Sequence, residues 1–409
     1  MTSGRAVPTI VLLALTAAGP SCAPARRAPP PEEIVFWQPW PSGAIRPLLD
    51  DFERSHPGFV VRLRQLPAAM ERDSIEAALA AGHAPDLCGI GSPEMCRLLA
   101  GGRLADWSAG VADLRDSLRG WELCSVGDAL YGVPWLLEPR VLYYEKALFA
   151  RAGLDSTRAP RTWDELARAA AAVQGLGHGI HGYGIPAGER GALAKDVLSF
   201  VCGVGGRVLS EDRRRAVFDS AANVRAIEFY LRVRRAALVA SPDSLDREFR
   251  SGRLGLLQSG PGLLRRLRQD ARGLRYGVAP VPTPAPDSGA CWAGGEVLAS
   301  FNASKHKHEA LELARFLVQP PNARRLAVMI GSREPPTAGA DSTEYYRARP
   351  RERMMVGQLR IACYAPSHPA WGEMEACIDD QVGAALLGGR TAAEVVDSVQ
   401  ARIQALTRH

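Results

Sequence analysis

The chain has 409 residues, of which 46% are hydrophobic and 23% are charged, with 40 Gly, 30 Pro and 8 Cys. This length predicts two or three domains, and the composition excludes collagen-like, coiled-coil and broadly disordered proteins. The net charge of +6 comes from 50 basic and 44 acidic residues that are interleaved along the chain. We expect the densest basic runs, 213–215 and 265–266, on solvated helix faces, and we do not expect a nucleic-acid partner.

The first 22 residues are predicted to be a targeting segment. Arg5 precedes the apolar run Val7–Ala18, which is followed by Gly-Pro-Ser and Cys22. The run has the length of a signal-peptide core and is shorter than the roughly 20 residues of a membrane-spanning helix. We therefore expect a lipoprotein-type signal peptide over residues 1–22 that ends at an acylated Cys22, then a Pro-rich tether over residues 23–31. Secretion without a lipid is the alternative.

Without Cys22 the chain keeps an odd number of cysteines, so they cannot all pair within one molecule. We expect mostly buried thiols, with one disulfide such as Cys88–Cys96. No C-x-x-C motif occurs, and no His lies at metal-ligand spacing from a cysteine, so a zinc site is not expected. The histidines of the segment 304–308 open an amphipathic helix and are expected to be solvated.

Predicted strands and helices alternate after the tether. Strands are predicted at residues 34–37, 59–63 and 86–90, and helices with apolar residues at 3.6-residue spacing at 45–52 and 75–81. This β-α-β-α-β order predicts an open, largely parallel sheet covered by helices, in which ligands bind at the carboxyl ends of the strands. Those ends carry Trp37, Gln38, Trp40 and residues 91–94.

A second group of elements begins near residue 131. Strand-like pieces at 131–135 and 141–144 flank an irregular stretch, and Thr162 with Glu165 predicts a reciprocal helix cap. Further helices are predicted at 192–202, 223–237, 244–251, 307–317 and 373–406, and further strands at 254–257 and 297–300. Two α/β lobes with several chain crossings account for this length better than one oversized domain.

Five motifs in register carry a resemblance to a known family: Ser42–Glu53, Ala84–Asp86, Tyr131–Phe149, Pro160–Leu166 and Gly294–Leu298. In this order and spacing the chain resembles the extracellular solute-binding proteins of ABC importers, in the family-1, maltose-binding-like carbohydrate group. The resemblance covers about residues 32–406. It implies an α/β, two-lobe periplasmic-binding-protein fold of type II, with open, mainly parallel sheets flanked by helices and a hinge between the lobes.

The resemblance also implies the division and the role of the lobes. Lobe 1 would comprise residues 32–138 plus 292–335, and lobe 2 residues 140–290 plus 340–409. The lobes would close as rigid bodies on one ligand. The implied protein is not an enzyme and needs no cofactor. It is an extracytoplasmic, monomeric receptor, anchored to the membrane by its N-terminal lipid, that captures a mono- or short oligosaccharide and delivers it to the transmembrane subunits of an ABC permease.

A site for a neutral sugar needs flat aromatic rings for the C–H faces and polar groups for the hydroxyls. We expect ligand contacts from the aromatic residues Trp37, Trp40, Trp135, Trp292 and Trp371, and from the polar residues Gln38, Ser92, Glu94, Glu138, Arg140, Arg190, Arg207, Glu296 and Glu373. Trp107, Trp121 and Trp163 are assigned to packing. Gly262 stands where the family often has an aromatic residue, which argues against a long oligosaccharide.

Two alternative readings stay open. The same fold can bind glycerol phosphate, a polyamine, a chelated metal or another small polar solute, and a phosphate ligand would use Arg140, Arg190 or Arg207 near helix N-termini. A secreted glycoside-processing enzyme would also combine aromatic residues with paired carboxylates. No nucleophile elbow or Ser-His-Asp pattern can be identified in the sequence.

Overall fold

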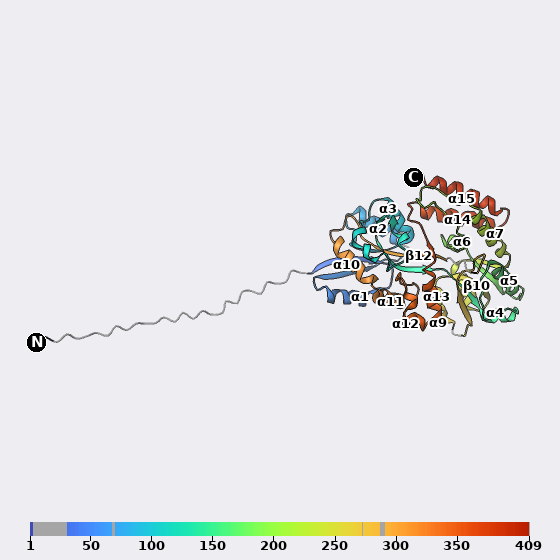
Figure 1. Cartoon of the computed structure of the whole chain (residues 1–409), viewed down its shortest axis with the longest axis horizontal. Helices are drawn as coiled ribbons and strands as arrows, with labels where there is room; N and C mark the ends of the chain where they lie inside the picture. Colours follow the sequence, from blue (N-terminus) through green and yellow to red (C-terminus); the bar gives the residue numbers. More distant parts are fainter. Residues whose placement is uncertain (3–30, 68–69, 272, 287–290, 409) are drawn as a thin grey trace.

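The computed structural model describes residues 1–2, 31–67, 70–271, 273–286 and 291–408. It contains two large mixed sheets, each flanked by helices, and one small two-stranded sheet. Figure 1 shows α1, α2, α3 and α10 gathered around the first sheet, and α4–α7, α14 and α15 around the second, with β12 between the two bodies. Cys22 lies outside the described residues. In the described ranges no helix is both long enough and apolar enough to span a bilayer.

The first large sheet has the strand order β13-β12-β3-β1-β2, and β6 also pairs with β12. β1 runs parallel to β2 and β3, whereas β12 runs antiparallel to β3 and β6. The parallel part is the predicted β-α-β-α-β unit. The strand bounds are β1 Glu32–Gln38, β2 Phe59–Gln65, β3 Leu87–Gly91, β6 Val133–Pro139, β12 Cys291–Ala299 and β13 Ala362–Tyr364.

The second large sheet has the order β11-β7-β10-β8-β9. β8 runs parallel to β10 and β9, so the carboxyl ends of these three strands lie at one edge. Its strands are β7 Val141–Glu145, β8 His181–Pro186, β9 Ala237–Ala240, β10 Leu254–Ser259 and β11 Tyr276–Ala279. The small sheet pairs β4 Ser125–Val126 with β5 Ala129–Leu130.

Helices connect the strands and cover both sheets. Around the first sheet lie α1 Ser42–Ser55, α2 Glu71–Ala80, α3 Ser92–Ala100, α10 Lys307–Val318 and α11 Pro320–Ile330. Around the second sheet lie α4 Lys146–Arg151, α5 Trp163–Gln174, α6 Ala192–Cys202, α7 Ala221–Val233, α8 Pro242–Arg250 and α9 Pro261–Asp270. The C-terminal region adds α12 Glu344–Arg347, α13 Pro350–Gln358, α14 Trp371–Leu386 and α15 Ala392–Leu406.

The chain passes between the two sheets within one residue. β6 belongs to the first sheet and β7 to the second, with only Arg140 between them. The backbone N–H of Arg140 donates to the carbonyl of Trp292 at 3.0 Å, which ties this crossing to β12. The predicted irregular stretch at this place is therefore corrected, because residues 136–139 continue β6 along β12.

Two other local predictions are corrected. Arg213–Arg215 lie in a turn, with Arg213 at φ 60°, rather than on a helix. Thr162 caps α5 as predicted, because its side chain accepts from the N–H of Glu165. A reciprocal cap would have the carboxylate of Glu165 accept from the N–H of Thr162, but its hydrogen bond at 2.7 Å comes from the N–H of Arg161. A reciprocal capping box instead begins α15, at Thr391.

The predicted disulfide Cys88–Cys96 is wrong. Cys202, at the end of α6, is bonded to Cys363 in β13, whereas Cys88 and Cys96 are free and buried. The bond therefore joins a helix of the second body to a strand of the first sheet. Spacing along the chain does not reveal such a pairing, because the two cysteines meet only after both sheets have formed.

Candidate ligand-binding site

A polar cavity lies at the carboxyl edge of the second sheet. β8, β9 and β10 end at this edge, and α6, α8 and α9 follow them. The first residues of these helices and the end of β6 enclose a cavity of about 240 Å³. Because ligands of open α/β sheets bind at strand carboxyl ends, this cavity is the candidate site.

The cavity lining is rich in charge of both signs. Its basic residues are Arg140, Lys195 and Arg266, and its acidic residues are Glu138, Glu189, Asp196, Asp243 and Asp246. Arg266 and Asp246 form an ion pair. Among the residues that the structure describes, Arg140 and Lys195 form no ion pair, and no aromatic side chain lines the cavity.

One residue of the cavity lining, Gln258, has a side-chain amide with one unused acceptor. Gln258 is 4% exposed, and its Nε2 donates to the carbonyl of Asp196 at 3.2 Å and to Oγ of Ser199 at 2.8 Å. The Asp196 carbonyl can only accept, so it fixes the orientation of the amide. The Oε1 atom of Gln258 then has no hydrogen-bond partner among the described residues.

Asp196 is itself buried beside this amide. The hydroxyls of Tyr230 and Tyr183 donate to its Oδ2 at 2.7 and 3.4 Å. Burial raises the pKa of the Asp196 carboxyl to about 7, although the Tyr230 hydroxyl and the charge of Arg140 favour its ionised form. At neutral pH this carboxyl is therefore only partly charged.

A chain of polar contacts leads from the cavity to the first sheet. Arg333, which follows α11, has its Nη2 at 3.4 Å from Oε2 of Glu138 and its Nε at 3.4 Å from Oε1 of Glu296. The indole N–H of Trp40 donates to Oε2 of Glu296 at 3.1 Å, and the guanidinium of Arg333 lies 5.0 Å from the centre of the Trp40 ring. Glu138 therefore belongs both to the cavity and to this chain of contacts.

The two carboxyls on Arg333 have opposite pKa shifts. Burial alone would raise the pKa of Glu138, but the charges of Arg333, Arg140, Lys195 and Arg266 outweigh it and lower that pKa. Burial raises the pKa of Glu296 to about 6, against the attraction of Arg333 and with a contribution from the charge of Glu138. Glu138 is thus firmly ionised, and Glu296 takes up a proton in mildly acidic solution.

Four of the predicted site residues lie along this route: Trp40, Glu138, Arg140 and Glu296. Gln38 holds the backbone of Trp40 in place, because its buried side chain accepts from the N–H of Trp40 and donates to the Trp40 carbonyl. Ser92 donates to the carbonyl of Gly295 at 2.8 Å and so joins α3 to β12. Both residues position the neighbouring backbone.

Three tryptophans predicted to contact ligand, Trp135, Trp292 and Trp371, lie in the core instead. Trp135 and Trp371 are each 0% exposed. The ring of Trp135 lies 5.8 Å from that of Phe36, and that of Trp371 lies 5.8 Å from that of Trp292, which is also buried. Their positions between strands and helices leave no free ring face for a sugar, which corrects the prediction.

The remaining predicted residues lie elsewhere. Trp37 is buried under the guanidinium of Arg64 and lines a separate cavity beside α2. Glu94 pairs with Arg97, and Arg207 is exposed and pairs with Glu211. Arg190 donates to the carbonyl of Gly372 in a groove between α6 and α14, and Glu373 is exposed in the first turn of α14. Trp107 and Trp163 are buried as packing residues, as predicted.

Sequence patterns missed Lys195, Gln258, Arg266 and Arg333, which lie in helices, at strand ends or in a loop without a local motif. They also missed Glu71, at the start of α2. This carboxyl accepts from the N–H of Gly91 at 3.0 Å, and burial, with the charges of Glu94 and Glu296, raises its pKa to about 7. Strand-end reasoning could have found Gln258, because β10 was predicted to end close to it.

Comparisons with known sequences agree with this architecture. The family model for bacterial extracellular solute-binding proteins matches residues 38–324. A putative binding protein of Brucella abortus is 24% identical over 370 residues, covering 87% of this chain and 88% of the relative. An uncharacterized lipoprotein of Streptomyces antibioticus is 28% identical over 342 residues, covering 78% of this chain and 73% of the relative.

Solved structures show the same fold. The cyclic α-maltosyl-1,6-maltose binding protein of Arthrobacter globiformis superposes with a TM-score of 0.83 at 21% identity, covering 92% of this chain and 99% of that one. UgpB of Mycobacterium tuberculosis, in complex with glycerophosphocholine, gives a TM-score of 0.77 at 23% identity, covering 92% and 98%. The two-lobe fold and the matched family model lead to one conclusion: the chain belongs to the bacterial extracellular solute-binding proteins, which serve ABC importers.

Proposed function

We propose that this chain captures a neutral sugar, a monosaccharide or short oligosaccharide, between its two lobes and delivers it to an ABC permease. In this proposal lobe 1 comprises residues 32–138 plus 292–335, and lobe 2 residues 140–290 plus 340–409. The strand β13 of this last segment pairs with β12 and so lies in the sheet of lobe 1. The ligand occupies the polar cavity of the second sheet and reaches Trp40 on the first. Closure bends the chain at its crossings, one of which is Arg140.

The unused acceptor of Gln258 is the observation that carries this proposal. A buried polar atom without a partner costs about 1–3 kcal/mol. Gln258 lines the cavity, and its Oε1 atom is buried in this structure, so a ligand must reach it as the lobes close. A ligand hydroxyl that then donates to Oε1 would remove this cost, and a ligand without a donor there would leave it in place. A site built around such an atom selects for hydroxylated ligands.

The balance of charge supports a neutral ligand. Asp246 is paired with Arg266, and Glu138 with Arg333. The remaining cations, Arg140 and Lys195, line the same cavity as the carboxyls of Asp196, Glu189 and Asp243. This set gives little net attraction to an anion or a polyamine. Hydroxyl groups both donate and accept, so a sugar can use both kinds of side chain.

Size supports a short ligand. The cavity of about 240 Å³ is smaller than the roughly 300–1,000 Å³ of sites for drug-sized molecules. Gly262 lines it where the family often has an aromatic residue, so the second sheet contributes no stacking platform from this position. A long oligosaccharide needs several such platforms.

Esters of glycerol phosphate are the second candidate. Two observations favour them: Arg140 and Lys195 line the cavity without an ion pair among the described residues, and the fold is shared with a glycerophosphocholine-bound protein. An ester of this kind would place its phosphate against these two side chains. Arg207 has no part in this alternative, since it pairs with Glu211 on the surface.

A thermal-shift panel followed by calorimetry tests the choice. The panel contains neutral mono- and disaccharides, glycerol 3-phosphate and glycerophosphocholine. A specific ligand at a hundred times its Kd stabilises the fold by about 2.7 kcal/mol. The proposal expects a neutral sugar to give the largest shift. The double variant Arg140→Met/Lys195→Met should weaken the binding of that sugar modestly; abolished binding, or a larger shift with a phosphate ester, would favour the second candidate.

Catalysis is the rival from another class. Glu138 and Glu296 both contact Arg333, and the pKa of Glu138 is lowered while that of Glu296 is raised. Catalytic acid–base pairs of carboxyls show the same pattern. Our proposal assigns them to holding Arg333 and Trp40. Incubating the protein with the stabilising sugar and analysing the sugar by mass spectrometry distinguishes the two, since a receptor returns it unchanged.

We propose the same extracytoplasmic, membrane-anchored location as the sequence predicts, with acylation at Cys22 and a monomeric receptor docking on a permease. The similarity to a lipoprotein of Streptomyces antibioticus supports this. Expression in a bacterial host with a labelled fatty acid tests it: the wild-type chain should carry the label and fractionate with membranes, and Cys22→Ser should do neither.

A further inference from the structure

We propose that Glu32, His306 and Glu309 form a binding site for one divalent transition-metal ion, with Zn²⁺ as the representative ion. Glu32 is the first residue of β1, His306 directly precedes α10, and Glu309 lies in the first turn of α10. Each offers one ligand atom, and these atoms all lie within 4.8 Å of one another. The site lies outside the ligand cavity and is independent of the proposed function.

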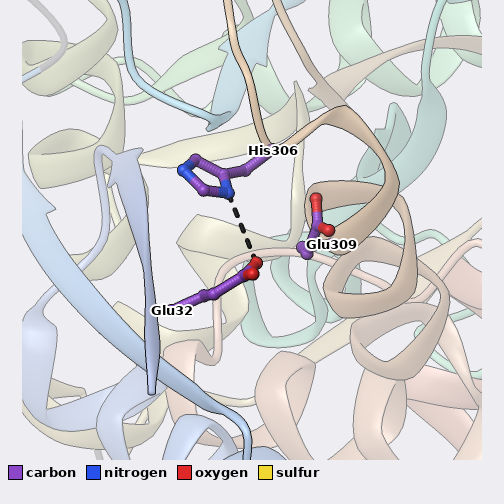
Figure 2. Close-up of side chains that lie close together, drawn as sticks. All are labelled: Glu32, His306 and Glu309. Carbon is purple, nitrogen blue, oxygen red and sulfur yellow. Dashed lines mark ion pairs between the residues drawn. The ribbon is translucent and has the colours of Figure 1, made fainter. Parts of the chain in front are cut away.

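The geometry suits a shared ion. Figure 2 shows the imidazole of His306 and the carboxylate of Glu32 pointing toward each other, with Glu309 beside them. Nδ1 of His306 is 3.6 Å from Oε2 of Glu32. Two ligands on one tetrahedral Zn²⁺, each about 2.1 Å from the ion, stand about 3.4 Å apart. Rotation of an exposed glutamate side chain closes the remaining gaps.

The residues that carry the ligands are fixed by a buried hydrogen-bond network. The backbone N–H of His306 donates to Oγ of Ser304 at 3.0 Å, and this hydroxyl donates to Oδ1 of Asp86 at 2.6 Å. Oδ2 of Asp86 accepts from the N–H of Val35 in β1 at 2.9 Å. Asp86 and Ser304 are both buried. β1 and the approach to α10 are therefore held together before any ion binds, as a preorganised site requires.

The charges near the cluster leave room for a cation. Among the described residues, neither Glu32 nor Glu309 is paired with a lysine or an arginine. The Nζ of Lys307 is turned to the carbonyls of Asn302 and Ser304, at 3.1 and 2.6 Å. Two neighbouring carboxylates without a lysine or arginine partner repel each other, and a bound divalent ion removes that repulsion.

The donor set selects the class of metal. One imidazole nitrogen and two carboxylate oxygens suit Zn²⁺ and similar ions, whereas Ca²⁺ and Mg²⁺ prefer oxygen ligands alone. Three protein ligands leave a fourth position for water, and Glu32 is 56% exposed at its side chain, so solvent can reach the ion. The seven residues of β1 place this site about 20 Å from the strand end that carries Gln38.

Isothermal titration of the untagged full chain, stripped with EDTA, with ZnCl₂ tests the proposal. We expect one ion per chain. Glu32→Gln, His306→Asn and Glu309→Gln should each weaken binding at least about tenfold. The matched control is His308→Asn, because His308 is 77% exposed in the same segment and lies 3.3 Å from Glu312 instead. Its binding should equal that of the wild type.

Cu²⁺ as a second probe identifies the nitrogen ligand directly. Electron paramagnetic resonance of the 1:1 complex should show coupling to one imidazole nitrogen, which His306→Asn removes and His308→Asn keeps. The proposal is overturned by absence of 1:1 Zn²⁺ binding, by equal losses in the His306 and His308 variants, or by CaCl₂ binding as tightly as ZnCl₂. The substituted side chains are at least partly exposed, so thermal melting will show that each variant is folded.

Discussion

Arg333 and Glu138 form an ion pair, with 3.4 Å between Nη2 and Oε2, where the chain leaves the first sheet for the second. Glu138 stands two residues before the crossing into β7, and Arg333 follows α11. On its other side Glu138 rests against Gly260, where a Cβ would lie 2.6 Å from Oε1 of the glutamate. Glu138 is therefore held between an arginine of the first body and the start of α9 in the second.

Removing the arginine should destabilise the fold at neutral pH. Arg333→Met leaves the carboxyls of Glu138 and Glu296 without their shared cation, and we expect a loss of about 1–3 kcal/mol in the free energy of unfolding, measured in urea. The control is Arg207→Met, which breaks an exposed pair with Glu211 and should change stability by less than about 1 kcal/mol. Equal effects of the two variants would show that the buried contacts do not matter.

The fold should be more stable in mildly acidic solution than at pH 8. Burial raises the pKa of Glu296 to about 6, of Glu71 and Asp196 to about 7 and of Glu334 to about 8. Groups with raised pKa values bind protons more tightly in the folded chain, so stability grows as the pH falls through these values and is fully gained below the unfolded pKa values. We expect the melting temperature to rise from pH 8 to about pH 5.

Glu334→Gln isolates one of these groups. The carboxyl is 5% exposed and accepts from the hydroxyl of Tyr346 at 3.1 Å. The amide keeps the acceptor and cannot ionise, so the pH dependence of stability between pH 7 and 8 should flatten. Glu344→Gln, an exposed residue of α12, serves as control and should leave the profile unchanged. An unaltered profile in the Glu334 variant would contradict the assignment.

The disulfide should contribute to stability. Cys202 and Cys363 are 161 residues apart in the chain, and loss of a native disulfide typically costs about 2–5 kcal/mol. We expect the double variant Cys202→Ser/Cys363→Ser to lose stability in this range. The control is Cys88→Ser/Cys96→Ser, which replaces two buried cysteines without breaking a disulfide. In the wild-type chain, peptide mapping under non-reducing conditions should find Cys88 and Cys96 as free thiols. A Cys88–Cys96 peptide would contradict the structure.

The core position of Trp135 can be tested through its neighbour Gly89. A Cβ at Gly89 would lie 2.6 Å from Cζ3 of Trp135, so Gly89→Ala should cost about 1–3 kcal/mol through overpacking. Gly43→Ala in α1 meets nothing within 4 Å and should be neutral or slightly stabilising. If Gly89→Ala were as neutral as this control in chemical denaturation, the packing described for Trp135 would be wrong.

Much of the fold was predictable from local patterns. Apolar spacing placed β1, α1, β2, α2 and β3 in order, because a buried face imposes its period on the sequence. The same patterns missed α11 and α13, which begin with proline and carry two arginines each. The two cysteines of the disulfide could not be paired from sequence, because their meeting depends on how the two bodies pack.

The site was predictable in part. Trp40 follows a predicted strand, Glu138 and Arg140 lie between two predicted strands, and Glu296 directly precedes one. The structure brings all four to one region. The expectation that a tryptophan near a strand end contacts ligand was wrong for Trp135. Alternate residues of a strand point to opposite faces, so a shift of one residue along the strand moves a side chain from one face to the other. Arg333 and Gln258 act through partners distant in sequence, which no local motif records.

The central claim is that one solute contacts both bodies at once. Trp40 stands on the first sheet and Gln258 on the second, so calorimetry of the strongest-binding sugar against Trp40→Ala and Gln258→Leu tests it most directly. The account predicts that each substitution weakens the binding of this sugar at least about tenfold, while Arg207→Ala leaves the affinity unchanged. Wild-type affinity in either of the two variants would contradict it.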